Sequence, residues 1–184
     1  KKNTPPHIIT IDKNKFRKNN SIQLSADSKK TILFSGDSFT FGDGVNDSPF
    51  SVSAWIDFDT TASTNYIACK FNNVPSPDDG EWVFFRSNSG MIRLRLLDES
   101  ASAVVYADSS GLNSLGTAVG ADGDYNHVVA TYDGRGGANA ANGINIYING
   151  ENVTQNRTNS ASYVAMENTT EPFCLGNRES NSSS

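Results

Sequence analysis

The sequence has few cysteines, histidines and charged residues and no long apolar run, which excludes several classes of protein. It has two cysteines and two histidines among 184 residues, too few for a disulfide-dense scaffold or for a zinc site built from cysteine. No apolar run approaches the ~18 residues that a membrane-spanning helix needs, so we expect no membrane span. Charged residues make up only 19% of the chain and hydrophobic residues 36%, and Ser, Asn, Thr and Gly fill the deficit. The net charge of −5 argues against a partner recognised through phosphates, so we expect no nucleic acid.

The two cysteines, Cys69 and Cys174, are the whole supply of sulfur ligands. Their separation in the sequence does not show whether they lie near each other, so a single disulfide bond between them stays open. Because cysteine is among the most buried residue types, the default expectation is two buried thiols.

Charge is unevenly distributed along the chain. Residues 1–30 carry eight basic and two acidic side chains, a net charge of +6, whereas residues 31–184 carry seven basic and eighteen acidic ones, a net charge of −11. The sequence therefore predicts a basic N-terminal arm or linker over 1–30 and an acidic body over 31–184. The arm is expected to be solvated; the alternative is that it docks on a negative surface, such as a neighbouring copy.

Alternation of apolar and polar residues is the main pattern from residue 50 onward. Residues 50–58, 92–97 and 144–148 alternate with period two, which is typical of strands with one buried face. Residues 126–133 are mostly apolar and β-branched. Asn149-Gly150 is a strong hairpin signal, and a return strand is expected to start at Glu151-Asn152-Val153. Weaker strands are expected at 31–35, 38–41, 65–71, 81–87, 102–107 and 171–176. Clusters of Gly, Asn, Asp, Ser and Pro separate the strands, and no helical period persists for three turns, so the sequence predicts an all-β antiparallel sandwich.

Four segments resemble successive strands of one known family. They are SVSAWI (51–56), NHVVATYDG (126–134), INIYINGENV (144–153) and PFCLGNRES (172–180). Together they resemble the concanavalin A-like lectin/glucanase superfamily, and within it the laminin-G/pentraxin-like domains, over about residues 31–180. The resemblance implies a two-sheet jelly-roll sandwich of the kind found as modules in secreted, bacterial-surface and phage structural proteins. It does not imply one function, because the fold hosts lectins, glycanases and spacers.

The end of the chain departs from the family pattern. Such domains usually close with a last strand paired beside the first strand, and this chain stops at a run of serines. We therefore expect a fragment of a longer protein, because a missing strand leaves an open sheet edge. The alternative is that a strand at 7–11 in the arm takes that place.

Catalytic residues are not evident. The glucanase branch of the superfamily places three acids on one strand as Glu-x-Asp-x-x-Glu, and this sequence has no such run. His127 would have to serve any Ser–His–acid triad, and it is more consistent with a packed, hydrogen-bonded strand residue. We therefore expect no enzyme.

A calcium site and a glycan site are the binding sites that the sequence suggests. Relatives with this fold often hold Ca²⁺, and the metal candidates are Asp37, Asp43, Asp47 and Asp133, with Asp122 and Asp124 as a further pair. The alternative is that these residues cap turns through side-chain-to-backbone bonds.

The glycan candidates are Trp82, Arg86, Arg93 and Arg95. They would form an aromatic and cationic platform, which would also suit a carboxylated sugar because arginine pairs with a carboxylate through two hydrogen bonds. Trp55 is interpreted as a core residue of the second sheet and not as a shelf for sugar.

The sequence favours a non-catalytic, surface-exposed structural or adhesion module of a larger assembly, of the virion or bacterial-surface kind, with weak carbohydrate recognition. Its expected partners are surface glycans or neighbouring copies, in an oligomer or within a larger protein. Its expected location is extracellular or on a virion or cell surface. Two alternatives remain, a dedicated Ca²⁺-dependent lectin and a glycoside hydrolase.

Overall fold

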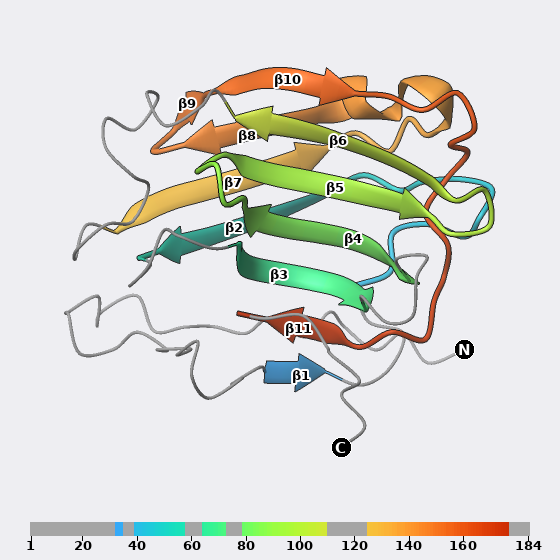
Figure 1. Ribbon diagram of the computed structural model, residues 1–184, viewed down its shortest axis with the longest axis horizontal. Coiled ribbons are helices and arrows are strands. Elements are labelled where there is room, and N and C mark those ends of the chain that lie inside the picture. The colour runs from blue at the N-terminus through green and yellow to red at the C-terminus, as the bar shows by residue number, and fades with distance from the viewer. Residues whose placement is uncertain (1–31, 35–38, 58–63, 73–78, 110–124, 177–184) are drawn as a thin grey trace.

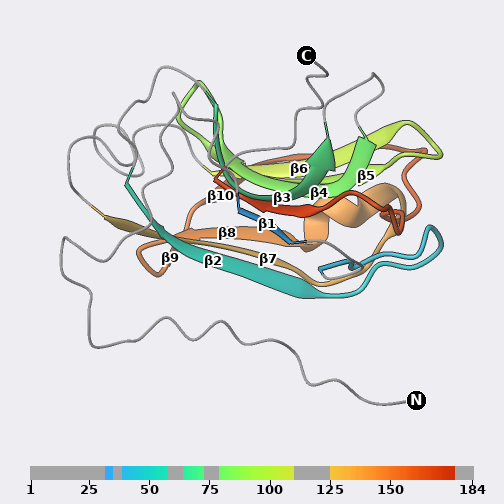
Figure 2. The same ribbon diagram turned by 90° about the horizontal axis from the view of Figure 1, so that it is seen from below.

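Two antiparallel sheets pack face to face in the computed structural model, which describes residues 32–34, 39–57, 64–72, 79–109 and 125–176. The seven-stranded sheet has the order β1-β11-β3-β4-β5-β6-β10 and the four-stranded sheet the order β2-β7-β8-β9 (Figure 1). Figure 2 shows the two sheets as separate layers, with the 3₁₀ helix η3 between them at one end. The elements are β1 Ile32–Phe34, β2 Phe50–Ile56, β3 Asn65–Asn72, β4 Asp79–Arg86, β5 Ile92–Asp98, β6 Ala103–Ser109, β7 Asn126–Tyr132, η3 Gly137–Gly143, β8 Ile144–Ile148, β9 Glu151–Asn152, β10 Thr154–Thr158 and β11 Phe173–Leu175.

Strong alternation in the sequence corresponds to strands with one buried face. From Ile92 to Leu96 in β5, and throughout β8, the residues alternate between buried and partly exposed positions, as the period-two pattern predicts. The turn at Asn149-Gly150 is also confirmed, since both residues have positive φ, 51° and 88°. The core lies between the inward faces of the two sheets, and its fully buried members include Leu94, Leu96, Val105, Val128, Ala130, Ile144 and Ile146.

Three expectations about elements differ from the structure. Over the described residues 39–41 of the strand expected at 38–41 no strand forms, because Phe39 takes a left-handed turn conformation (φ 67°). Residues 137–143, expected as loop, contain η3, whose Ala140 and Ala141 are buried in the core. The return strand expected from Glu151 is divided in two. Glu151–Asn152 forms β9 beside β8, whereas Thr154–Thr158 forms β10, which pairs with β6 at one edge of the other sheet although it has no apolar alternation.

The two ends of the folded body meet in one sheet. β11 lies between β1 and β3 and pairs antiparallel with both, so residues 173–175 lie beside the first strand. The arm over 1–30, including the expected strand at 7–11, lies outside the described residues. In the part of the chain that the structure describes, no helix is long and apolar enough to cross a membrane.

A single carboxylate joins its own loop to the end of strand β7 and to the connection between β10 and β11. Asp47 Oδ2 accepts hydrogen bonds from the hydroxyls of Tyr132 (2.7 Å) and Tyr163 (3.0 Å), and its Oδ1 accepts one from the backbone N–H of Met166 (2.8 Å). Burial raises the pKa of Asp47 above its ordinary value, although these three donors act in the opposite direction. The raised pKa shows that Asp47 is held in place at an electrostatic cost.

A second buried polar group lies beside Trp82 in the sandwich. Lys70 Nζ is 2.8 Å from Glu81 Oε1, and both side chains are fully buried. A β-bulge makes this contact possible, because the register between β3 and β4 shifts at Lys70/Phe71 and leaves Glu81 as the extra residue. Burial raises the pKa of Glu81 despite its hydrogen bond from Lys70, and Glu81 Oε2 has no hydrogen-bond partner in the described part of the chain.

Removing the Asp47 carboxylate should destabilise the fold strongly. Asp47→Ala leaves three buried donors without an acceptor, and we expect a loss of about 3–5 kcal/mol in the free energy of unfolding. Urea denaturation followed by tryptophan fluorescence measures it. Asp43→Ala is the matched control in the same loop, because Asp43 accepts hydrogen bonds from the backbone N–H groups of Val45 and Asn46 at an exposed position. Equal losses in the two variants would contradict the assignment.

Breaking the Lys70–Glu81 pair on one side should cost more than replacing both residues. Lys70→Met leaves a buried carboxylate without its countercharge, for which we expect a loss of about 3–5 kcal/mol. The double variant Lys70→Met/Glu81→Leu removes the stranded charge and should recover most of that stability. Denaturation curves of the wild type, both single variants and the double variant give the coupling energy. Strictly additive losses would show that the pair does not act as a unit.

Candidate ligand-binding face

The four residues expected to form a glycan platform do not share a face. Trp82 lies opposite Leu96 and Arg86 opposite Ile92, so both point into the sandwich, where they are 2% and 1% exposed. Arg93 and Arg95 lie on the other face of the sheet, opposite Phe85 and Val83. The expectation was wrong because β4 is apolar on both faces, so its own pattern does not show which residues point outward.

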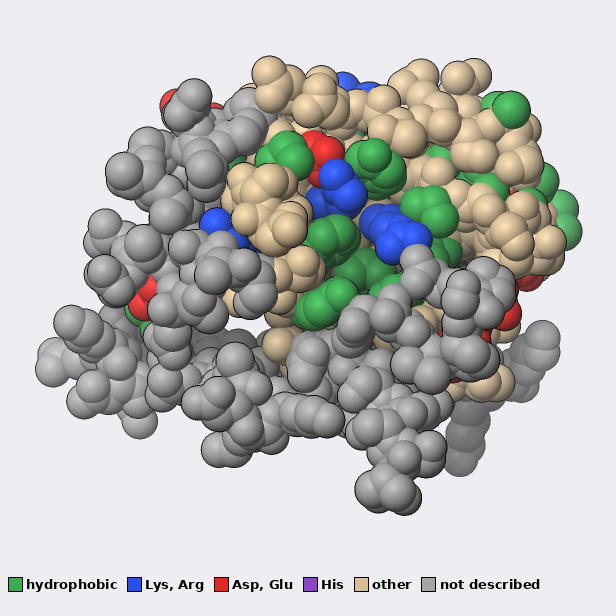
Figure 3. Space-filling model, viewed as in Figure 1, with side chains coloured by type: hydrophobic (Ala, Val, Ile, Leu, Met, Phe, Trp, Pro, Cys, Tyr) green, Lys and Arg blue, Asp and Glu red, His purple; other side chains and the backbone are tan. Residues whose placement is uncertain are grey.

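Arg93 and Arg95 nevertheless lie in two rows of side chains on the outer face of the seven-stranded sheet. The register places Tyr66, Phe85, Arg93, Asp108 and Asn156 directly opposite one another, in that order, on β3, β4, β5, β6 and β10. The next row contains Val83, Arg95, Tyr106 and Thr158. We call Tyr66, Phe85, Arg93, Arg95, Tyr106 and Asp108 the arginine face. Figure 3 shows Lys or Arg side chains in the middle of this surface, next to an acidic side chain and surrounded by hydrophobic ones.

Arg93 is the fixed centre of the arginine face. Its guanidinium makes two parallel hydrogen bonds to Asp108, through Nε to Oδ1 and through Nη2 to Oδ2 (2.9 Å). The same group stacks on Tyr106, 4.0 Å from the ring centre, and approaches Phe85 at 5.8 Å. The hydrogen bonds that Arg93 donates to Asp108 raise the pKa of Arg93 above its ordinary value. The planar guanidinium is therefore held in one orientation by a carboxylate and two rings.

The arrangement suits neutral sugars better than acidic ones. Aromatic side chains offer faces for the C–H surfaces of a sugar ring, and the fixed Arg93–Asp108 pair offers both donors and acceptors to hydroxyl groups. A ligand carboxylate would have to displace Asp108 from the fork of Arg93 to pair with it. The expected use of three arginines for a carboxylated sugar is therefore not supported, since Arg86 is buried and Arg93 is already engaged.

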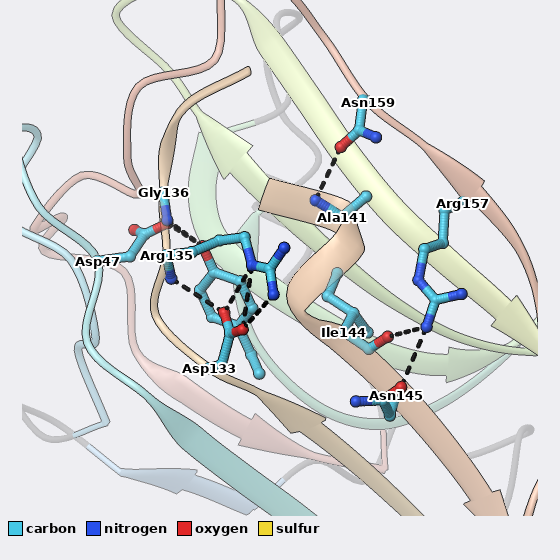
Figure 4. Close-up of polar contacts among 10 residues, drawn as sticks. Asp47, Asp133, Arg135, Gly136, Ala141, Ile144, Asn145, Arg157 and Asn159 are labelled. Atoms are coloured by element: carbon cyan, nitrogen blue, oxygen red, sulfur yellow. Dashed lines mark hydrogen bonds and ion pairs between the residues drawn. The ribbon is translucent and has the colours of Figure 1, made fainter. Parts of the chain in front are cut away.

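The expected calcium ligands are engaged in other contacts where the structure describes them. Asp133 forms a bidentate pair with Arg135 (Nη2 to Oδ2, 2.6 Å) and accepts the backbone N–H of that residue, as Figure 4 shows. This pair lowers the pKa of Asp133. Asp43 caps its turn, and Asp47 accepts hydrogen bonds from Tyr132, Tyr163 and Met166.

These contacts match the turn-capping alternative for Asp43 and a structural role for Asp47 and Asp133. Asp37, Asp122 and Asp124 lie outside the described residues. Within the ranges that are described, no group of three or more His, Cys, Asp or Glu side chains is placed to hold a metal ion.

An acidic depression is a feature that the sequence analysis missed. It has a volume of about 480 Å³ and is lined by Asp79, Glu99, Ser100, Glu167, Asn168, Thr169, Thr170 and Glu171. Burial and the nearby carboxylates of Asp79 and Glu167 raise the pKa of Glu99. Its acids come from three separate segments, so no local motif could have indicated it.

Trp55 is exposed, contrary to the expectation that it is a core residue. It lies on the outer face of β2 with 55% of its surface accessible, and its ring stacks on that of His127 across the strand pair (5.0 Å between centres). His127 also shares a hydrogen bond with the Ser53 hydroxyl (2.8 Å), so it is a hydrogen-bonded strand residue as expected. Trp55 therefore marks a second exposed aromatic position, on the opposite sheet from the arginine face.

Replacing Arg93 by lysine should test whether its planar group orders the arginine face. Arg93→Lys keeps the charge and loses both the bidentate pair and the stack, so we expect a loss of about 1–2 kcal/mol in unfolding free energy. Arg135→Lys is the control, because the same pairing with Asp133 is made there by exposed side chains and should lose less. An unchanged stability of Arg93→Lys, measured by thermal and urea denaturation, would contradict a fixed guanidinium.

Comparison with known proteins supports the family suggested by the strands. The family model described as Laminin_G_3, concanavalin A-like lectin/glucanases superfamily, matches residues 17–184. No curated protein matches the chain. The match covers most of the chain, and its start at residue 17 falls within the stretch predicted to be the arm, whose boundary at residue 30 stays a prediction. The two antiparallel sheets agree with this match, and the chain therefore belongs to the concanavalin A-like lectin/glucanase superfamily as a laminin-G-like domain.

Proposed function

We propose that this domain is a non-catalytic adhesion module that recognises carbohydrate weakly through its arginine face. The observation that carries the proposal is the row Tyr66–Phe85–Arg93–Asp108, which combines two aromatic rings with a fixed, planar ion pair on one outer surface. Family membership supports a lectin-like or adhesive role at the level of the fold.

The electrostatics of the arginine face favour binding of uncharged hydroxyl groups. Arg93 and Asp108 neutralise each other, and only 23% and 5% of their side-chain surfaces are exposed. Because neither group has to be reoriented, a sugar hydroxyl meets donors and acceptors that are already in position. Tyr106 supplies a ring next to them, partly exposed and already stacked under Arg93.

An open face of this kind favours low affinity at each site. A surface that buries one side of a sugar gains less than a deep pocket that encloses it. Many copies on one particle compensate, because linking weak sites raises the overall avidity by about 10²–10⁴ without any new contact. We therefore place the module on the surface of a larger assembly, such as a virion or a bacterial envelope, outside the cell.

The chemistry of the described carboxylates supports binding over hydrolysis. A glycosidase needs two carboxyl groups about 5–9 Å apart across a sugar, one of them protonated. On the arginine face both oxygens of Asp108 already accept hydrogen bonds from the guanidinium of Arg93. Glu81 has a raised pKa but is fully buried inside the sandwich. None of the described residues that line the depression beside Glu99 is aromatic.

Removing the tyrosine ring should weaken carbohydrate binding. We expect Tyr106→Ala, displayed in many copies, to bind neutral glycans on an array about tenfold more weakly per site than wild type, because a stacked ring contributes about 1 kcal/mol or more. Biolayer interferometry with the best glycan measures the affinity.

Trp55→Ala is the matched control, since it removes an exposed ring from the opposite sheet. Loss of binding in Trp55→Ala with Tyr106→Ala unaffected would move the site to the other sheet. If the folded wild type gives no signal on the glycan array, the carbohydrate proposal is rejected and a role as a structural spacer becomes the better account. Repeating the array with a chelator shows whether Ca²⁺ contributes, and release of reducing sugar from bound glycans would identify an enzyme.

A further inference from the structure

The two cysteines are direct neighbours across a strand pair. Cys69 on β3 lies opposite Cys174 on β11 in the antiparallel register, although more than a hundred residues separate them in the sequence. Both side chains are fully buried, and both are thiols in the structure. The register therefore supplies the proximity that sequence separation could not show.

The geometry of such a pair fits a disulfide bond. Directly opposite residues of antiparallel strands have Cα atoms about 4.5 or 5.5 Å apart, depending on their place in the hydrogen-bond ladder. Disulfides bridge Cα atoms about 4.4–6.8 Å apart, so both kinds of pair lie within the range. Opposite residues also project to the same face of the sheet, so the two sulfur atoms are on the same side.

The side chains around the two cysteines are apolar, which favours an uncharged disulfide bond between them. Cys69 and Cys174 belong to a small apolar cluster with Phe71, Val83 and Leu97, distinct from the core between the sheets. A disulfide is apolar and carries no donor that such a cluster would leave unsatisfied. β11 has only three residues, yet it lies between β1 and the rest of the sheet. A disulfide bond between β11 and β3 would therefore hold this short strand, and β1 with it, in the sheet.

We propose that Cys69 and Cys174 form a disulfide bond when the chain folds in the presence of a small-molecule disulfide such as oxidised glutathione. The thiolate of one cysteine attacks a glutathione sulfur, which breaks the S–S bond and releases one glutathione thiolate. The thiolate of the second cysteine attacks the protein sulfur of this mixed disulfide and releases the second glutathione. The protein loses two hydrogens and is oxidised by two electrons, and one glutathione disulfide is reduced to two thiols.

Burial determines when the bond forms. A reagent the size of glutathione cannot reach side chains with no accessible surface, and exchange requires direct attack on sulfur. The bond therefore forms during folding, before the cluster closes, and it resists reductant afterwards. Oxidation of the folded, reduced chain should be slow, and its rate should follow opening of β11 from β3.

Refolding with and without oxidant tests the proposal. The full chain is reduced, unfolded and refolded in a glutathione redox buffer, the remaining thiols are alkylated in denaturant, and the protein is digested without reductant. We expect one linked peptide pair containing Cys69 and Cys174 and no alkylated cysteine. We also expect the oxidised chain to melt about 5–15 °C above the reduced chain, as a disulfide that closes a long loop predicts. Two alkylated cysteines in the folded chain would overturn the proposal.

A second variant tests whether the disulfide requires the two cysteines to lie opposite each other on β3 and β11, or only requires two cysteines in the chain. Cys174→Ala/Leu175→Cys keeps two cysteines and moves one of them to the opposite face of β11, where its partner position on β3 is Ala68. This variant should not form the intramolecular bond under the same conditions. If it forms the bond as readily as wild type, pairing through the register is wrong. The wild-type peptide map decides the question by itself if the variant does not fold.

Discussion

The antiparallel register of β3, β4, β5 and β6 is the constraint on which the rest of the molecule depends. It places Leu94 and Leu96 toward the second sheet and, on the same strand, Arg93 and Arg95 toward the outside. A shift of one residue would exchange the two sets and bury both arginines, so the core and the arginine face are fixed together. Hydrophobic burial of one side thus sets the positions of the charged groups on the other, without any need for the arginines to contribute to stability.

Buried polar groups determine how the loops and the sheets meet. Asp47 joins the end of β7 at Tyr132 to the connection that contains Tyr163 and Met166. Asp98 accepts the backbone N–H of Val164 in that same connection. In a chain with few hydrophobic residues, hydrogen bonds of this kind specify a single arrangement of long connections that apolar contacts alone leave undetermined. The raised pKa of Asp47 shows that this specificity has an electrostatic cost.

The sequence predicted the architecture and most strands because burial on one face imposes period two directly on the residues. It did not predict that the return strand changes sheets at β10, because Thr-Gln-Asn-Arg-Thr is exposed almost throughout and shows no apolar pattern that would reveal its partner β6. Two of the four glycan candidates, Arg93 and Arg95, lie on the outer face, whereas Trp82 and Arg86 do not, because β4 is apolar on both sides. Pairings between distant strands, such as that of β3 with β11, depend on topology and leave no local signal.

Strand β10 has a further consequence for a domain carried in many copies. It closes one side of the seven-stranded sheet in the described structure, and four of its five side chains are exposed and polar. Arg157 reaches back from it to the carbonyl oxygen of Ile144 and to Asn145, as Figure 4 shows. An edge strand with exposed polar side chains and a charge disfavours pairing with a strand of another molecule, because those side chains would have to lose their hydration. Many copies can therefore be carried on one particle without aggregating through this edge, because β10 disfavours edge-to-edge strand pairing between neighbouring copies.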